Sequence, residues 1–279
     1  MLFRSSLRNK VSLTKYLSSA DESSAEAAFL SIGAGDLYRQ VLKPFLAGVL
    51  LTDPKNVSNR ATKELVRSFI RSSPGIPAMG VGEFARNLAL PLHDIQLSTP
   101  VESLHDGFVR TKKGKVSGDC IIVATDPVTA AQLLGSPQAP RMNQSTTWYH
   151  ALDEGEITSQ RLRIDMKNSG PVINSIAISN LSPYYSPGGK TLISSTTITP
   201  ASESEVRRHL AQLWKVSTQS WDLVSKYELK QSLPRHEVGQ PSEQSVQIKP
   251  NLFVVGDHRG LPSQQGAMYS GRRAAELIN

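Results

Sequence analysis

The sequence predicts a mixed fold of helices and strands, of the α/β (α+β) kind, and three observations support this prediction. Helical patterns fill the first part of the chain, and strand patterns dominate from about residue 95 onward. The chain closes with an apolar strand at 252–256, an acid directly after it, and a helix of small residues that reaches residue 278. A strand, an acid and a helix in this order are typical of open α/β sheets, which bind ligands at the carboxyl ends of their strands.

Composition limits the class of protein. The 279 residues, 39% of them hydrophobic, allow one large domain or two small ones. No apolar run approaches 18 residues and no secretory signal follows Met1, so we expect a cytoplasmic protein. The net charge of +7 favours a solvated basic surface. Attraction to an anionic membrane surface is the next interpretation, and nucleic acid is the least favoured because aromatic residues make up only 6%.

Cysteine and histidine predict no metal site. The single cysteine, Cys120, excludes an internal disulfide and favours a reducing compartment. It lies within the apolar run 118–125, where we expect a buried strand residue. The six histidines show no metal-ligand spacing, and no order of Ser, His and Asp suggests a nucleophile. His258 and Arg259 are of interest only because they follow Asp257.

The first part of the chain is predicted to be mainly helical. Residues 1–35 are polar and rich in serine, with short helical patches, and Pro44 interrupts the next helical pattern. Asn56 or Ser58 can cap a helix whose apolar residues share one face. The predicted segments are a helix at 36–50, a helix at 59–72, a Gly- and Pro-rich loop at 73–82 and a short helix at 83–92.

The second part is predicted to be mainly strands. Asp126 and Pro127 suit the first positions of a helix at 126–134, and Ser202 with Glu205 forms a capping-box pattern that opens a helix ending at 214. The predicted strands are 95–106, 107–114, 118–125, 144–151, 172–179, 191–198 and 220–229.

The closing unit has features that suit a ligand. Gly256 lets a ligand approach the backbone, and Asp257 stands at the carboxyl end of the strand. The helix that starts near 264–266 presents N–H groups with partial positive charge. Small residues make one side of this helix narrow. Ligand binding and plain α/β packing both remain open on these features alone.

The segment "FVVGDHRGLPSQQGAMYSGRRAAELI" resembles the C-terminal flavin-binding segment of the FAD-dependent amine oxidase and phytoene desaturase superfamily. Three further segments are similar to the desaturase-like branch in the same order along the chain: "LKPFLAGVLLTDPKNVSNR", "GIPAMGVGEFARNLA" and "LSTPVESLHDGFVRTKKGKVSGDCIIVATDP". The resemblance therefore covers residues from about 36 to 278. It implies an incomplete FAD-binding Rossmann-like layer interwoven with a substrate domain of antiparallel sheet and helices.

One departure from the family pattern is large. Members open with a strand and Gly-x-Gly-x-x-Gly, which holds the FAD pyrophosphate, and this sequence has no such unit. In "SIGAGDLYRQ", Gly33 and Gly35 fit the first two glycine positions, but Tyr38 stands at the third. We predict a turn between helices there. By comparison with the family, roughly the first third of the fold is absent, through a gene split, a misassigned start or a real truncation.

The resemblance implies FAD as the cofactor, bound weakly or not at all by this chain alone. Asp257 would accept a hydrogen bond from a ribitol hydroxyl, and the backbone of Val101 would touch the adenine end. We name no catalytic side chain, because desaturase-like members often lack an obvious acid or base. The cofactor-binding residues that we expect are Val101, Gly256, Asp257, Ser263, Gln265, Gly266 and Ala267.

The resemblance also implies a domain organisation. Residues 1–35 would be a polar N-terminal segment, 36–74 and 140–234 the substrate domain, and 75–139 and 235–279 the partial FAD-binding domain. Trp148 and Tyr149 would lie on a substrate-domain strand, where we expect core packing.

Two functions from different classes follow. The first is an FAD-dependent oxidoreductase that moves a hydride from an apolar substrate carbon to flavin N5. The alternative is a non-catalytic remnant or subunit that binds a partner chain or lipid. A complementing chain, a homo-oligomer and a peripheral membrane contact are the partners that we consider, and nucleic acid is not expected.

Overall fold

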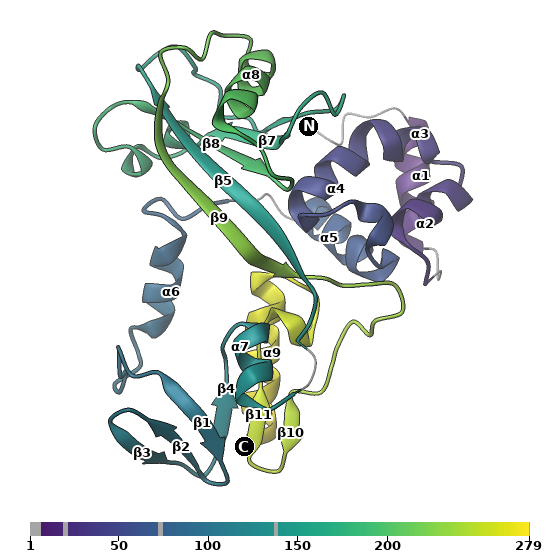
Figure 1. Ribbon diagram of the computed structural model, residues 1–279. Coiled ribbons are helices and arrows are strands. Elements are labelled where there is room, and N and C mark those ends of the chain that lie inside the picture. Colours follow the sequence, from purple (N-terminus) through teal and green to yellow (C-terminus); the bar gives the residue numbers. More distant parts are fainter. Residues whose placement is uncertain (1–6, 19–21, 72–74, 137–138, 279) are drawn as a thin grey trace. The chain divides into compact units, whose positions relative to one another are not determined.

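The computed structural model describes residues 7–18, 22–71, 75–136 and 139–278. The chain divides into two compact units, residues 1–91 with 143–232 and residues 92–142 with 233–279. Figure 1 shows helices and strands in both, which confirms the predicted mixed fold. The domain bounds that the family resemblance implies concern the division of function and stay a prediction.

The first unit begins with helices, and the core among them is formed by residues between Tyr16 and Val66. The helices are α1 (Leu7–Ser18), α2 (Ala25–Ser31), α3 (Gly35–Leu37), a π-helical turn η1 (Tyr38–Leu42), α4 (Lys43–Leu50), the short η2 (Pro54–Asn56), α5 (Asn59–Arg71) and α6 (Val81–Ala89). The rings of Tyr16, Phe29 and Tyr38 stack in this core. Segment 1–35 thus supplies buried side chains despite its polar composition.

The helical predictions for this part are confirmed. Pro44 lies in the first turn of α4, directly after the π turn, where a missing N–H is tolerated. The hydroxyl of Ser58, rather than Asn56, accepts from the first turn of α5 through the N–H of Arg60. Gly33 has φ +72° and lies between α2 and α3, so the glycine pair at 33–35 is a turn between helices, as predicted.

The first unit also holds a sheet of order β6-β7-β8-β5-β9. Its strands are β5 (Met142–Leu152), β6 (Arg163–Ile164), β7 (Val172–Ala177), β8 (Thr191–Thr197) and β9 (Asp222–Pro234). Short turns η3 (Ile178–Asn180) and η4 (Pro183–Tyr185) follow β7, and α8 (Glu203–Trp214) covers one face of the sheet (Figure 1). Trp148 is buried beneath α8, which confirms its predicted core role. The capping box of Ser202 and Glu205 is formed as predicted.

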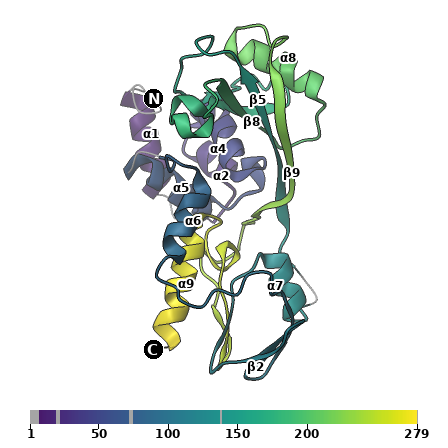
Figure 2. The ribbon, with the colours of Figure 1, turned by 90° about the vertical axis from the view of Figure 1, so that its left-hand side faces the viewer.

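The second unit is built on two small sheets. One is the antiparallel meander β1 (Val101–His105), β2 (Phe108–Thr111) and β3 (Gly114–Ser117). The other has the order β10-β11-β4, from β10 (Gln247–Lys249), β11 (Leu252–Val254) and β4 (Ile121–Val123). Helix α7 (Pro127–Leu133) packs on one face of β4 and β11, and α9 (Gln264–Ile278) packs on the other (Figure 2).

Two expectations were wrong in detail, one in this unit and one in the first. Cys120 was expected to be a buried strand residue, but it is only half-buried and lies one position before β4. The apolar side chains that follow it make the strand, while Cys120 itself packs at the margin of the α9 core. The loop predicted at 73–82 ends two residues early, because α6 begins at Val81.

Candidate functional site

The site begins with two strands that run in parallel. Ile121, Ile122 and Val123 of β4 lie opposite Leu252, Phe253 and Val254 of β11. The backbone N–H of Val255 continues the pairing to the carbonyl of Val123 at 2.9 Å. The chain leaves both strands at the same edge, and an aspartate follows each of them. Carboxyl edges of parallel strands are where α/β sheets bind ligands.

The first aspartate has a structural role. Asp126 caps α7, and its carboxylate accepts from the N–H groups of Val128 and Thr129, both at 3.0 Å. These hydrogen bonds lower the pKa of its carboxyl, the largest contribution coming from Thr129. Asp126 and Pro127 therefore open α7 as predicted. Because its Oδ1 accepts both of these hydrogen bonds from the helix, Asp126 acts as a cap.

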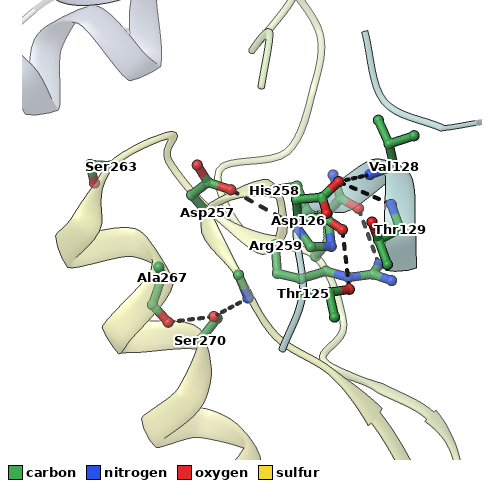
Figure 3. A network of polar contacts seen from close by, with 12 residues as sticks. Thr125, Asp126, Val128, Thr129, Asp257, His258, Arg259, Ser263, Ala267 and Ser270 are labelled. Atoms are coloured by element: carbon green, nitrogen blue, oxygen red, sulfur yellow. Dashed lines mark hydrogen bonds and ion pairs between the residues drawn. The ribbon is translucent and has the colours of Figure 1, made fainter. Parts of the chain in front are cut away.

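Gly256 makes the turn from β11 to the second aspartate. Its φ of +147° is rarely adopted by residues with a side chain, and an added Cβ would lie 2.8 Å from the ring of His258. The N–H of Gly256 donates to Ser270 Oγ at 2.8 Å, and that hydroxyl donates to the carbonyl of Ala267 at 2.7 Å (Figure 3). Ser270 of α9 thus ties the turn to the helix, a role that the sequence did not indicate.

Ser263 fixes the start of α9. Its hydroxyl accepts from the N–H of Gly266 at 3.0 Å, and its carbonyl accepts from the N–H of Ala267 at 3.0 Å. A Cβ on residue 266 would lie 2.0 Å from the carbonyl oxygen of Leu261. Gly266 is therefore required by the close approach of this backbone, which positions the positive end of the helix.

Asp257 and His258 are the titratable groups of this turn, the 3-10 turn η5 (Asp257–Arg259). Burial raises the pKa of the Asp257 carboxyl. Burial, helped by the charge of Arg259, lowers the pKa of His258 to about 4, so its ring is neutral at pH 7. The two side chains approach to 3.9 Å between Asp257 Oδ1 and His258 Nδ1, which is too long for a hydrogen bond (Figure 3). Within the described residues, His258 Nδ1 is buried without a hydrogen-bond partner.

A small pocket of about 200 Å³ opens beside these two side chains. Its polar lining also includes Arg235, His236 and Gln240. A half-buried carboxylate with a raised pKa gains when a hydroxyl donates to it. The pocket therefore offers an acceptor for a polyhydroxyl chain next to the positive end of a helix.

The structure brings most of the predicted site residues together. Gly256, Asp257, Ser263, Gln265, Gly266 and Ala267 all lie in the connection from β11 to α9. Val101 does not lie in this connection, because it begins β1 in the meander sheet. Among the described residues, no group of three or more His, Cys, Asp or Glu side chains could hold a metal ion. No helix in the same ranges has the length and apolar character needed to cross a bilayer.

The fold defines a class of protein, a unit of the α/β type that carries a second part with an antiparallel sheet. Comparison with family models is more specific. The chain belongs to the flavin containing amine oxidoreductase family, whose model matches residues 4–279. The resemblance drawn from its sequence motifs is thereby confirmed. No curated protein matches the sequence significantly.

Solved structures agree on the fold. An oxidoreductase from Methanosarcina mazei has a TM-score of 0.73 at 13% identity, over 99% of this chain and 74% of that chain. A protein from Pyrococcus furiosus has a TM-score of 0.73 at 14% identity, over 96% of this chain and 71% of that chain. A protein from Exiguobacterium sp. 255-15, described as a candidate protoporphyrinogen oxidase, has a TM-score of 0.67 at 15% identity. The similarity covers 98% of this chain and 72% of that chain. At these identities the similarity concerns architecture.

Proposed function

We propose that this chain holds the flavin end of FAD at the connection from β11 to α9 and serves an oxidation of an apolar substrate. One observation carries the proposal. The half-buried carboxylate of Asp257 lies at the carboxyl edge of the parallel pair β4 and β11, next to the start of α9. Family membership supports a flavin-dependent oxidoreductase, and the assignment of FAD to these residues is ours.

The residues of the connection fit an FAD molecule at its flavin end. When bound, the flavin supplies a hydride acceptor, N5, for a substrate carbon. Asp257 would accept from a hydroxyl of the ribityl chain. The first turn of α9 would place partial positive charge near the flavin N1–C2 edge. Because Ser263 already accepts from the N–H groups of Gly266 and Ala267, the contribution of these two residues would be the helix dipole rather than direct hydrogen bonds.

An aromatic cluster in the first unit supports an apolar substrate. The rings of Tyr149 on β5 and Tyr227 on β9 meet edge to face, with centroids 6.0 Å apart. Tyr185 contributes to the same cluster, because burial and then the nearby Tyr149 raise the pKa of its phenol. Its hydroxyl donates to the carbonyl of Pro77 at 2.9 Å. Tyrosine rings offer flat apolar surface, so this cluster supports a substrate with hydrophobic or unsaturated surface.

A complementing chain or segment would supply the pyrophosphate end of the FAD site. Within the described residues, β4 pairs with β11 on one side and with no strand on the other. Ile122 is 47% exposed in this strand. An unpaired edge of this kind is a template for another strand. We therefore expect the chain alone to bind FAD weakly, because no glycine-rich turn donates to the phosphates.

The alternative, a non-catalytic subunit that binds a partner chain or lipid, is supported by a different observation. Exposed apolar side chains lie on and beside α6, including Met79, Val81, Leu88 and Leu90. Exposed apolar surface of this extent marks an interaction site. Reading the coding DNA upstream of Met1 separates the two functions. A frame that encodes a strand and Gly-x-Gly-x-x-Gly favours the oxidoreductase, and a stop codon with no partner gene favours the non-catalytic remnant.

A flavin titration tests the main proposal. The chain would be titrated separately with riboflavin and with FAD, and the quenching of flavin fluorescence measured. Because only the flavin end is recognised, we expect two weak affinities that differ by less than about tenfold. Several missing phosphate contacts correspond to roughly a thousandfold or more in affinity. A monomer that retains one FAD through gel filtration would contradict the expected weak binding, and quenching by neither flavin would contradict the site itself.

A further inference from the structure

The second unit contains another pocket, larger than the one beside Asp257. Its volume is about 890 Å³, within the range of small-molecule sites. Its walls come from the turn between β1 and β2, from the end of α7, and from the connection between β10 and β11. The apolar residues that line it are Leu104, Ile121, Leu133, Leu134, Ile248 and Leu252.

The charged group in this pocket is Arg259. The turn η5 contributes residues to both pockets. Asp257 and His258 line the smaller pocket, and Arg259 lines the larger one. The guanidinium of Arg259 donates a long hydrogen bond of 3.4 Å from Nη1 to Gln244 Oε1. Its Nε is buried and has no hydrogen-bond partner within the described residues. A guanidinium can donate five hydrogen bonds, so most of its capacity is unused.

The surroundings of Arg259 contain little negative charge. Burial lowers the pKa of its guanidinium, and no carboxylate forms an ion pair with it in the described part of the chain. Two other charged residues line the pocket, Lys249 and Asp106, both exposed, and their charges are opposite. The pocket therefore keeps a net positive charge beside its apolar wall. A half-buried guanidinium whose Nε is buried without a hydrogen-bond partner among the described residues is stabilised when an anion binds to it.

We propose that this pocket binds an amphipathic anion, with an acidic head group on Arg259 and a hydrocarbon body against the leucine and isoleucine wall. Phosphate and carboxylate heads share the required chemistry, because each can accept two parallel hydrogen bonds from a guanidinium. This pocket is distinct from the smaller one beside Asp257, although the turn η5 lines both, and the proposal does not depend on the proposed function.

Calorimetric titration of the full chain with octyl phosphate, octanoate and octanol tests the proposal. The first two are expected to bind and octanol to bind about tenfold more weakly or not at all. Arg259→Met keeps the approximate length of the side chain and removes the charge. It should therefore lower the affinity for the two anions about tenfold to a hundredfold. Arg272→Met is the matched control, because Arg272 is exposed on α9 and paired with Glu276.

A second variant guards against an effect of Arg259→Met on folding. Ile248→Glu places an acid on the wall at a position that is already 42% exposed, so the fold should tolerate it. It should weaken the anions and leave octanol unchanged. Binding of one anion and not the other would define the head group. Equal binding of octanol and octyl phosphate, or unchanged anion binding in both variants, would overturn the proposal.

Discussion

Two clusters of buried polar residues in this protein use similar side chains in opposite ways. In the first unit, Asp165 lies 3.1 Å from His209 Nε2, and the N–H of Val172 donates to His209 Nδ1 at 3.0 Å. Asp165 also accepts from the N–H groups of Lys167 and Ser169. In the second unit, the cluster of Asp257, His258 and Arg259 leaves several donors and acceptors without hydrogen bonds.

The difference shows that residue type does not separate a structural cluster from a binding site. In the first cluster, burial alone would raise the pKa of Asp165, but backbone N–H donors outweigh it and hold the pKa below its usual range. Since His209 Nδ1 accepts a hydrogen bond, its neutral ring carries the proton on Nε2 and donates it to Asp165. Every group there is satisfied internally. In the second cluster burial raises the pKa of Asp257 and outweighs the backbone hydrogen bonds that lower it, as expected of a carboxylate in a ligand site.

The largest effect should come from breaking the satisfied cluster. His209→Ala leaves the Asp165 carboxylate and the Val172 N–H buried without their partner, and should lower the free energy of unfolding by about 3–5 kcal/mol. Ser169→Ala, which keeps the pair of Asp165 and His209, should lower it by about 1 kcal/mol or less. Urea unfolding followed by circular dichroism measures both. Equal losses in the two variants would show that the pair is not the centre of the cluster.

Acid should destabilise the protein through two buried histidines. Burial, followed by the nearby arginines Arg207 and Arg259, lowers the pKa of His150 and His258 to about 4 each. Their folded pKa values lie below the unfolded value near 6.5, so the unfolded chain binds more protons between these limits. Stability is then complete above about pH 6.5 and is lost as the pH falls toward 4, by up to about 3 kcal/mol per histidine.

Urea unfolding at pH about 7 and about 4.5 checks this prediction. His150→Phe and His258→Phe should each reduce the difference in unfolding free energy between the two pH values. Asp257 acts in the opposite direction, because its raised pKa favours the folded state at low pH. A difference that stays the same in both variants would show that neither histidine is neutral in the fold.

The ligand-binding side of the comparison is tested by Asp257→Ala. Loss of a charged hydrogen-bond acceptor should weaken riboflavin binding by about 1–3 kcal/mol. Asp257→Asn keeps an oxygen acceptor and should lose less. Unfolding free energies should change little in either variant, because the cost of burying the carboxylate outweighs the backbone hydrogen bonds that it accepts. An unchanged flavin titration in both variants would remove Asp257 from the site.

The smallest effect is expected from Arg259→Met without ligand. The guanidinium has one long hydrogen bond, so the unfolding free energy should change by less than about 1 kcal/mol. The same urea experiment measures it. A loss as large as that of His209→Ala would place Arg259 among the satisfied, structural groups and contradict the contrast between the clusters.

Local signals in the sequence predicted the parts of the fold whose causes are local. The caps of Asp126 and Ser202 involve atoms no more than four residues apart, and both formed as expected. Strand β10 was not predicted, because its three residues are all exposed and it exists through pairing with β11. The predicted burial of Cys120 was wrong because the core against which it packs includes α9, which lies far along the chain.

The same division applies to the site. Residues 256–267 are close in the sequence, so their proximity in space followed from the strand, loop and helix pattern. The sequence did not show why residue 266 must be glycine. The reason is the close approach of the Leu261 carbonyl to this position in the folded chain. The pocket of Arg259 was also missed. Its walls come from residues 104–136 and 248–259, and no pattern within one segment shows that they meet.

The parallel pairing of β4 with β11 has a consequence for synthesis of the protein. The partner of β4 follows it by about 130 residues along the chain. At about 5–20 residues per second, translation of this stretch takes on the order of 10 s. During that time the nascent strand at Ile121–Val123 has emerged without its neighbour, while the intervening sheet of the first unit can already fold. We expect chaperones to contact this strand in that interval, and slow translation between the two strands to favour aggregation.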